Sequence, residues 1–355
     1  MGKKILFIVP YPYNTAPSQR LKFEQYYDDF EKLGYQITRS PFIGEGFWKI
    51  IYKKGFYFSK IVYTVLSYLR RYLALTKVSK YDIVYVHLWG TPFGFPVYEW
   101  LVRRLSKKVI YDIDDLIYQG GSSPNNAVAG FLKSKWKVNY LMKYADHVLV
   151  STDKLLNYTN QFTNHVSMIP ATIDVKKYNF KKNSDLDKVV IGWSGSHTTS
   201  KYLHLLDGVF KQILARHNDV KIMVMGDENY AVEGLDIELI EWTAETEIAN
   251  LQQFDIGLHP VPDEEWVYGK SGGKLVQYMA AGLPIIASAI GPNFKAISEG
   301  YNGFLVTTEV DWIDKLDLLI TDKQLRKQMG ANSKEFAIKH YSVEANLSKY
   351  LAAFN

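Results

Sequence analysis

Short runs rich in β-branched residues recur along the whole chain, and segments with helical spacing separate them. This alternation predicts parallel sheets, because each buried parallel strand needs a crossover, usually a helix, to reach the next one. The predicted strands are residues 5–9, 36–39, 83–87, 108–112, 147–151, 166–169, 189–193, 221–225, 237–241, 256–259, 284–288 and 303–306. Apolar residues three or four apart predict helices at 21–33, 134–144, 202–217, 245–253 and 310–320. Two such sets in succession predict an α/β chain with two doubly wound, Rossmann-like domains.

The length of the chain also predicts two domains. A chain of 355 residues is longer than one hydrophobic core usually organises, since cores stop growing beyond about 250–300 residues. Residues 171–188 are polar, rich in lysine and without a helical stripe, as expected of a linker. We therefore predict an N-terminal domain of residues 1–175, a C-terminal domain of residues 176–335, and a final helix, 336–355, that packs back toward the N-terminal domain.

The composition excludes several classes of protein. The chain contains no cysteine, which rules out a disulfide framework and thiolate metal sites and suits a reducing cytosol. No apolar segment reaches the ~20 residues that a membrane-spanning helix needs. The apolar run at residues 5–9 is too short for the core of a signal peptide. We therefore expect a cytoplasmic protein.

One insertion, residues 46–80, interrupts the alternation. It carries eight Lys or Arg, nine aromatic residues and no Asp or Glu. Such a mixture is typical of a segment that lies on an anionic bilayer, where each basic residue contributes about 1 kcal/mol. A core-packed helix with a basic solvated face, or a nucleic-acid patch, is the alternative. Because the apolar share exceeds what binding to a phosphate backbone requires, we expect an anionic membrane surface, at the inner membrane face, and no nucleic acid.

Residues 268–288, YGKSGGKLVQYMAAGLPIIAS, join a loop with glycines and lysines to a short helix and a buried strand. Amides freed by the glycines and by the first helical turn point at an anion, and the lysines add positive charge. This order predicts a diphosphate site for a nucleotide-linked substrate, whereas an ordinary loop with solvated lysines is the alternative. The candidate residues are Lys270, Ser271, Gly272, Gly273 and Lys274.

A second candidate for phosphate contact is the turn after residues 189–193. It contains Gly195 and Ser196, and Lys201 follows. Backbone amides of small residues can bind a phosphate there, although a tight turn without a ligand is the alternative. We expect phosphate contact, because this turn and the loop of residues 268–288 would lie on the same face of one sheet.

Polar residues also follow the first and third predicted strands. Ser18 and Arg20 are candidates for binding an acceptor or a phosphate, since a guanidinium forms bidentate hydrogen bonds. Ser18 could instead cap the predicted helix at 21–33. His87 is a candidate acceptor contact, although a histidine at such a position is more often structural. The first loop lacks the G-x-G-x-x-G of dinucleotide-binding oxidoreductases.

Three carboxylates end the fourth predicted strand, at Asp112, Asp114 and Asp115. Carboxylates alone suit Mg²⁺ or Mn²⁺, but no further ligand cluster is visible, and we predict no metal site. A structural aspartate that caps the next helix is another alternative. We expect Asp114 or Asp115 to face the reacting centre, as a base toward an acceptor hydroxyl or as the residue that positions it.

With these residues in view, the sequence resembles the retaining glycosyltransferases of family four, glycosyl transferases group 1, over nearly its whole length. The motifs that carry the resemblance are LVQYMAAGLPIIAS (275–288), EGYNGFLV (299–306), MIPATID (168–174), ADHVLVST (145–152) and GWSGS (192–196). The resemblance implies a GT-B fold, in which two Rossmann-like domains face each other across a cleft. It also implies an enzyme that uses a nucleotide-diphosphate-sugar donor and needs neither metal nor another cofactor.

The chain departs from the family pattern at the donor site. Family members usually carry two glutamates in this segment, and Gly269 and Gln277 stand at those positions. The resemblance therefore implies that Gln277 bonds the ribose and that the sugar is recognised by other groups. It leaves Lys274 and Lys201 as the cations on the diphosphate. The catalytic histidine of the family aligns with Asp114.

The sequence thus predicts a hexosyltransferase of polysaccharide biosynthesis. It would move a sugar from a UDP- or GDP-sugar to a lipid-linked or cell-surface glycan acceptor, with retention of configuration. Two alternatives stay open: a nucleotide-sugar epimerase of the same fold, which would need no acceptor, and a degenerate GT-B scaffold attached to the membrane, which the missing glutamates would allow.

Overall fold

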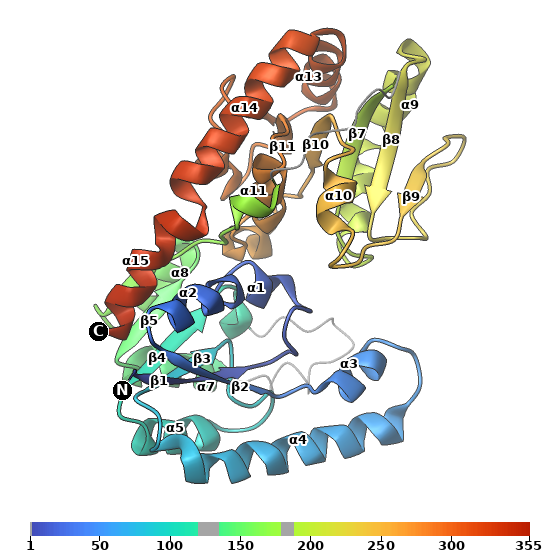
Figure 1. Cartoon of the computed structure of the whole chain (residues 1–355). Helices are drawn as coiled ribbons and strands as arrows, with labels where there is room; N and C mark the ends of the chain where they lie inside the picture. Colours follow the sequence, from blue (N-terminus) through green and yellow to red (C-terminus); the bar gives the residue numbers. More distant parts are fainter. Residues whose placement is uncertain (1, 120–134, 179–187) are drawn as a thin grey trace. The chain divides into compact units, whose positions relative to one another are not determined.

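The computed structural model describes residues 2–119, 135–178 and 188–355 and divides the chain into two compact units (Figure 1). The first unit comprises Met1–Pro170, Gly269–Ser271 and Leu347–Asn355, and the second comprises Ala171–Tyr268 and Gly272–Asn346. The chain passes from the first unit to the second at Pro170, close to residue 175, where the sequence analysis placed the boundary. Each unit has its own parallel sheet and its own hydrophobic core.

Six parallel strands form the sheet of the first unit, in the order β2-β1-β3-β4-β5-β6. Their bounds are Lys4–Val9 (β1), Gln36–Pro41 (β2), Ile83–His87 (β3), Val109–Ile113 (β4), His147–Val150 (β5) and Val166–Met168 (β6). Continuous Val, Ile and aromatic runs suit such a sheet because its strands are covered on both faces. Every residue of β3 and β4 is buried. The carboxyl ends of all six strands meet at one edge, where polar loops follow.

The helices of the first unit connect these strands. They are α1 (Pro17–Arg20), α2 (Tyr27–Lys32), α3 (Glu45–Ile51), α4 (Tyr57–Val78), α5 (Val97–Leu105), α7 (Lys135–Tyr144) and α8 (Asp153–Thr159), and most of α15 (Val343–Phe354) joins them. The predicted helix at 134–144 corresponds to α7, and its first residue lies outside the described residues. Tyr350 of α15 packs its ring 4.6 Å from that of Tyr26.

The single helix predicted at residues 21–33 is wrong. The chain forms α1, then a 3-10 turn at Glu24–Tyr26 (η1), and only then α2. The reason lies in two side chains that bond to the loop after β1: Gln19 accepts from the Tyr11 N–H and Glu24 from the Asn14 N–H, both at 2.9 Å. Ser18 lies inside α1 and does not cap it, since Ala16 precedes the helix.

The basic and aromatic insertion folds as α3 and α4. Phe42, Ile43 and Phe47 form a small core against which other residues of the two helices pack. In the described part of the chain, no helix is long and apolar enough to cross a membrane.

Arg71 of α4 ties this helix to the sheet. Its buried guanidinium donates hydrogen bonds to the carbonyl oxygens of Val9 (2.7 Å), Ser40 (2.5 Å) and Gly90 (3.0 Å), in or just after three different strands. Because buried carbonyl groups are costly to leave unpaired, these bonds fix α4 against the strand ends. Arg71 is therefore a structural residue and not part of the basic surface that the sequence suggested for the insertion.

We expect Arg71→Met to destabilise the protein by about 2–4 kcal/mol, because three buried carbonyl oxygens lose their donor. Urea unfolding followed by circular dichroism measures the change. Lys77→Met, at an exposed position of the same helix, is the matched control and should change stability by less than about 0.5 kcal/mol. Equal unfolding midpoints for the two variants would contradict the structural role of Arg71.

The second unit repeats the architecture, with strand order β12-β11-β10-β7-β8-β9, all parallel. Its strands are Val189–Ser194 (β7), Val220–Met225 (β8), Glu238–Ile240 (β9), Ile256–His259 (β10), Ile285–Ser288 (β11) and Gly303–Val306 (β12). Its helices are α9 (Asp207–Arg216), α10 (Glu247–Leu251), α11 (Gly273–Ala280), α12 (Asn293–Ala296), α13 (Glu309–Thr321) and α14 (Lys323–His340). All twelve predicted strands are confirmed, each within two residues of its predicted bounds.

Candidate active site

The second unit builds a candidate anion site where α11 begins. Gly272 precedes the helix with a φ of 71°, in the left-handed region that glycine adopts without strain. Gly282, with a φ of 74°, follows its end. The two glycines thus set where α11 starts and stops. The first N–H groups of any α-helix lack an intrahelical partner, so those of α11 can donate to an anion.

Lys274, in the first turn of α11, is the central cation of this site. Its Nζ lies 4.2 Å from the centre of the Trp193 ring and 3.3 Å from Oγ1 of Thr199. Among the described residues, no carboxylate lies within 4.0 Å of this ammonium. Burial lowers the pKa of Lys274 to about 7. The site therefore presents a cation that has no protein counter-ion.

The turn after β7 lies against this lysine. A Cβ atom at Gly195 would come within 2.6 Å of the Nζ of Lys274, and one at Gly226 would come within 2.0 Å of the Gly195 carbonyl oxygen. Glycine at both positions is what allows the close approach. Ser196, the next residue of the turn, is exposed. The structure thus brings the turn predicted for phosphate contact together with the first turn of α11.

The other residues predicted to bind the donor have different surroundings. Gln277 is on α11 and is buried, and Ser271 immediately precedes the Gly272 turn. Lys201 is exposed, and its Nζ lies 4.8 Å from the centre of the Tyr202 ring. None of these contacts joins Lys201 to Lys274, so its share in binding a diphosphate stays a prediction.

The first unit holds a buried charged cluster at the strand ends. Asp112, the fourth residue of β4, accepts an ion pair from Lys22 at 2.7 Å and a hydrogen bond from Nδ1 of His87 at 2.9 Å. All three side chains are 0–1% exposed. Burial alone would raise the pKa of Asp112, but Lys22 and His87 outweigh it and lower the pKa to about 2. Asp112 is therefore a charged structural anchor.

Asp114 lies beside this cluster without being part of its pairing. Its Oδ1 is 3.8 Å from Nε2 of His87, and neither atom has a hydrogen-bond partner among the described residues. Burial raises the pKa of Asp114, although His87 and Lys22 act in the opposite direction. A carboxyl group with an unused oxygen and a raised pKa is suited to exchange a hydrogen bond, or a proton, with a bound hydroxyl.

Asp115 is paired instead. Its Oδ2 accepts a hydrogen bond from Nζ of Lys270 at 2.6 Å, and its Oδ1 accepts one from the N–H of Leu116 at 2.8 Å. Both Asp115 and Lys270 belong to the first unit. The structure thus joins a residue predicted for catalysis to one predicted for donor binding, and each neutralises the other.

The predicted acceptor residues do not form one surface. Ser18 and Arg20 are half-buried on α1. His87 is 0% exposed and is held by Asp112. In this arrangement His87 has no surface with which to touch an acceptor, and its Nε2 instead faces Asp114. In the part of the chain that the structure describes, no group of three His, Cys, Asp or Glu could hold a metal ion.

Several residues of the site were not predicted. Lys22 stands in a segment predicted as a helix, and its sequence neighbours give no sign that it reaches Asp112. Trp193 lies within the GWSGS motif, whose glycines drew attention to the turn but not to the indole. His259 ends β10 with a buried, unpartnered Nδ1. Burial and the charge of Lys274 lower the pKa of His259 to about 3, so it is neutral.

Comparison with known proteins identifies relatives of the second unit. Residues 174–336 match the family model described as Glycosyl transferases group 1. A D-inositol 3-phosphate glycosyltransferase of Stackebrandtia nassauensis is 32% identical over 66 residues, 18% of this chain and 15% of that protein. An uncharacterized glycosyltransferase of Methanocaldococcus jannaschii is 26% identical over 223 residues, 59% of this chain and 60% of that protein. The chain thus spans less than two thirds of the length of these curated relatives.

The fold has close counterparts among solved structures. The Anabaena protein HepE, solved in complex with UDP-glucose, superposes with a TM-score of 0.68 at 16% identity and covers 99% of this chain and 100% of its own. The fold prediction is therefore confirmed: a two-domain α/β fold of the GT-B type. The prediction of a glycosyltransferase is confirmed at the level of the fold and the matched family model. Retention of configuration and the family-four assignment stay predictions.

We expect Lys274→Met to raise the stability of the ligand-free protein at pH 7, because the variant removes an unpaired buried charge. The pKa of this lysine is about 7 in the folded protein and about 10.4 when unfolded. The unfolded chain thus binds the extra proton between these values, and the stability of the native protein rises with pH across that window. The advantage of Lys274→Met should therefore shrink between pH 7 and pH 10.

Urea midpoints of both proteins across this pH range check the effect of Lys274→Met. Lys201→Met, an exposed position, serves as the control and should show no such pH-dependent difference. A variant that is less stable than the native protein at pH 7, or a difference that does not change with pH, would show that the ammonium is better solvated than its surroundings indicate.

Proposed function

We propose that the protein transfers a sugar from a nucleotide-diphosphate-sugar to a lipid-linked or cell-surface glycan acceptor, with retention of configuration and without a metal. One observation carries the proposal: the ammonium of Lys274, which has no counter-ion among the described residues, stands at the start of α11 within the region that matches glycosyl transferases group 1. A diphosphate is the anion that suits a lysine combined with helical N–H groups.

The proposed donor is a UDP- or GDP-sugar. The UDP-glucose in the Anabaena structure supports the uridine nucleotide as the first to test. In the proposed mechanism, Lys274 and the N–H groups at the start of α11 neutralise the charge that develops on the leaving diphosphate. The bond from the anomeric carbon to the diphosphate oxygen breaks, the acceptor oxygen bonds on the same face, and the hydroxyl proton passes to the diphosphate.

The first unit supplies the acceptor-side groups in this proposal. Asp114 receives a hydrogen bond from the acceptor hydroxyl and orients it, and His87 holds Asp114 from behind. Asp112 and Lys22 keep His87 in place. Ser18 and Arg20 are proposed to contact more distant parts of the acceptor. The acceptor would be presented at the inner membrane face, so the protein is proposed to work there as a peripheral enzyme of polysaccharide biosynthesis.

Lys274→Ala is expected to weaken UDP binding about 10–100-fold, equivalent to about 1.4–2.8 kcal/mol, because the diphosphate loses its main cation. Isothermal titration calorimetry measures this directly. Lys211→Ala, at an exposed position of α9, is the control and should bind like the native protein. Should neither UDP nor GDP bind the native protein, the donor proposal fails.

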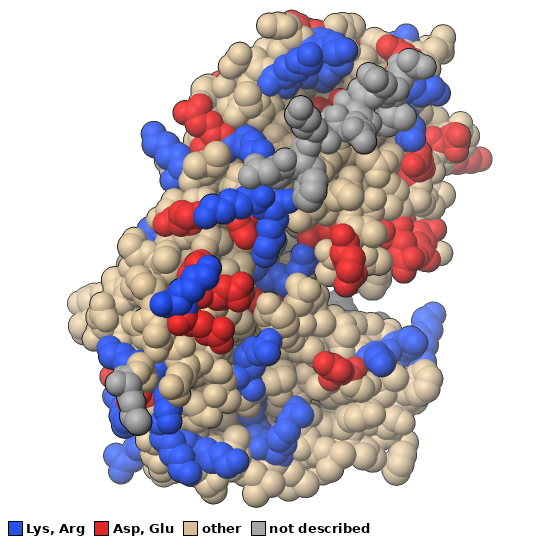
Figure 2. Space-filling model, in the orientation of Figure 1, with Lys and Arg blue, Asp and Glu red and all other residues tan. Residues whose placement is uncertain are grey.

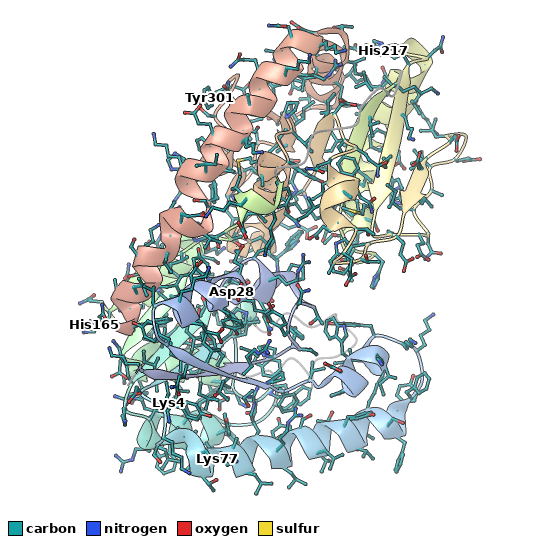
Figure 3. The ribbon with its side chains drawn as sticks, viewed as in Figure 1. Lys4, Asp28, Lys77, His165, His217 and Tyr301 are labelled. Carbon is teal, nitrogen blue, oxygen red and sulfur yellow. The ribbon has the colours of Figure 1, made fainter. Side chains whose placement is uncertain are left out.

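Asp114→Asn is expected to lower turnover about 10²-fold while nucleotide affinity stays unchanged, because the acceptor hydroxyl loses a properly charged partner. The measurement is release of nucleotide diphosphate with a membrane extract as the source of acceptor. Asp28→Asn, on the exposed surface of α2 (Figure 3), is the control. Full activity of Asp114→Asn would remove this residue from the mechanism.

Turnover without acceptor separates the remaining functions. A transferase releases nucleotide diphosphate in step with product formation on the acceptor. An epimerase would convert the nucleotide sugar when no acceptor is present. A scaffold would do neither while still associating with membranes.

A further inference from the structure

The outward face of α4 is apolar although it is exposed. Its large side chains recur at helical spacing and are Phe58, Ile61, Val65, Leu66, Leu69 and Leu73. Phe58 is 80% exposed and Leu73 is 70% exposed. The opposite face, with Arg71 and Leu75, is buried. The surface over α4, in the lower part of Figure 2, is largely uncharged. Exposed apolar patches of this size mark interaction surfaces.

The apolar surface continues onto the loop before α5 and onto α5 itself. Phe95 is 71% exposed, and Val97 and Trp100 are about half exposed. The loop is joined to α4 by two hydrogen bonds of 3.0 Å, because the hydroxyl of Tyr68 accepts from the N–H of Phe93 and donates to its carbonyl oxygen. The two helices therefore contribute to one face of the first unit.

Basic residues lie at both ends of α4 and none lie along its middle. Lys53 and Lys54 precede the helix, and Lys77 (labelled in Figure 3) and Lys80 lie near its C-terminal end, all exposed. Residues 61–69 carry no charge. A helix of 22 residues is about 33 Å long, so its lysines can reach headgroups at both ends while its middle contacts acyl chains.

These charges favour a bilayer over another copy of the chain. Both ends of α4 are basic, so two copies paired through this face would bring like charges together in either orientation. A nucleic acid would leave the apolar middle without a partner. An anionic bilayer matches both the lysines and the apolar side chains.

We propose that α4, the loop around Phe95 and the start of α5 form a single lipid-binding face, on which α4 lies flat in the headgroup region of an anionic bilayer. The inference rests on the proposed function, in which a lipid-linked acceptor brings the enzyme to a membrane, and adds the surface that binds it. Phe58, Leu66, Leu73 and Trp100 enter the acyl boundary, and the flanking lysines bind lipid phosphates.

Vesicle flotation of the full chain tests the face. The vesicles are phosphatidylcholine alone, or equal parts of phosphatidylcholine and phosphatidylglycerol. The native protein should float with the anionic vesicles and about tenfold less with the neutral ones. Ile61→Ser with Leu69→Ser should weaken binding to anionic vesicles about tenfold or more, since two apolar side chains no longer enter the bilayer. Val310→Ser with Ile338→Ser, exposed residues of the second unit, should bind normally.

Two further measurements make the outcomes decisive. Lys53→Gln with Lys54→Gln should reduce the preference for anionic vesicles. UDP affinity should be unchanged in every variant, which shows that they are folded. No preference of the native protein for anionic vesicles, or normal binding by the Ile61 and Leu69 variant, would overturn the proposal, as would a native dimer that this variant converts to a monomer. Loss of UDP binding by the native protein with vesicle binding intact would instead defeat the proposed function alone.

Discussion

Buried cations at the carboxyl ends of parallel strands organise the first unit. In a parallel sheet these ends meet at one edge, so a long basic side chain can bridge several loops there at once. Arg71 bridges the carbonyl groups of three segments. Lys137 donates to two carbonyl oxygens of the loop after β3, at 2.9 and 2.7 Å, and Lys22 joins Asp112 to the carbonyl oxygen of Ile169 at 3.3 Å. The positions of the acceptor-side loops depend on these bonds.

Lys274 of the second unit is the exception that gives this pattern meaning. It is also set at the strand ends, but an indole and a threonine hydroxyl surround it where the first unit offers carbonyl groups or a carboxylate. Such an environment holds an ammonium in position without satisfying its charge. Proteins keep destabilising features of this kind chiefly where function requires them. The contrast between the satisfied cations and this one is the strongest physical argument for an anionic substrate.

The strands could be predicted because β-branched runs and their spacing are local properties of the sequence. The site could be predicted only in part, because its decisive contacts are long-range. The helix after α1 is broken by Glu24, which bonds to a loop ten positions earlier. His87 is buried because Asp112, on the neighbouring strand, holds it. Trp193 and Lys274 meet although 81 positions separate them (274 − 193), and no periodicity in the sequence connects them.

Two departures from the family pattern lie together in the first unit. Gly269 stands where related sequences usually carry a glutamate, and a Cβ atom there would come within 2.3 Å of Leu116. Leu116 follows the segment in which Asp114 stands at the position of the family's histidine. A glutamate at 269 would therefore displace Leu116 and bring a further carboxylate toward two aspartates, where like charges repel. Lys270 instead pairs with Asp115 at 2.6 Å. The acid absent from one segment and the acid gained in the other are thus physically coupled, and either change alone would leave the local charge unbalanced.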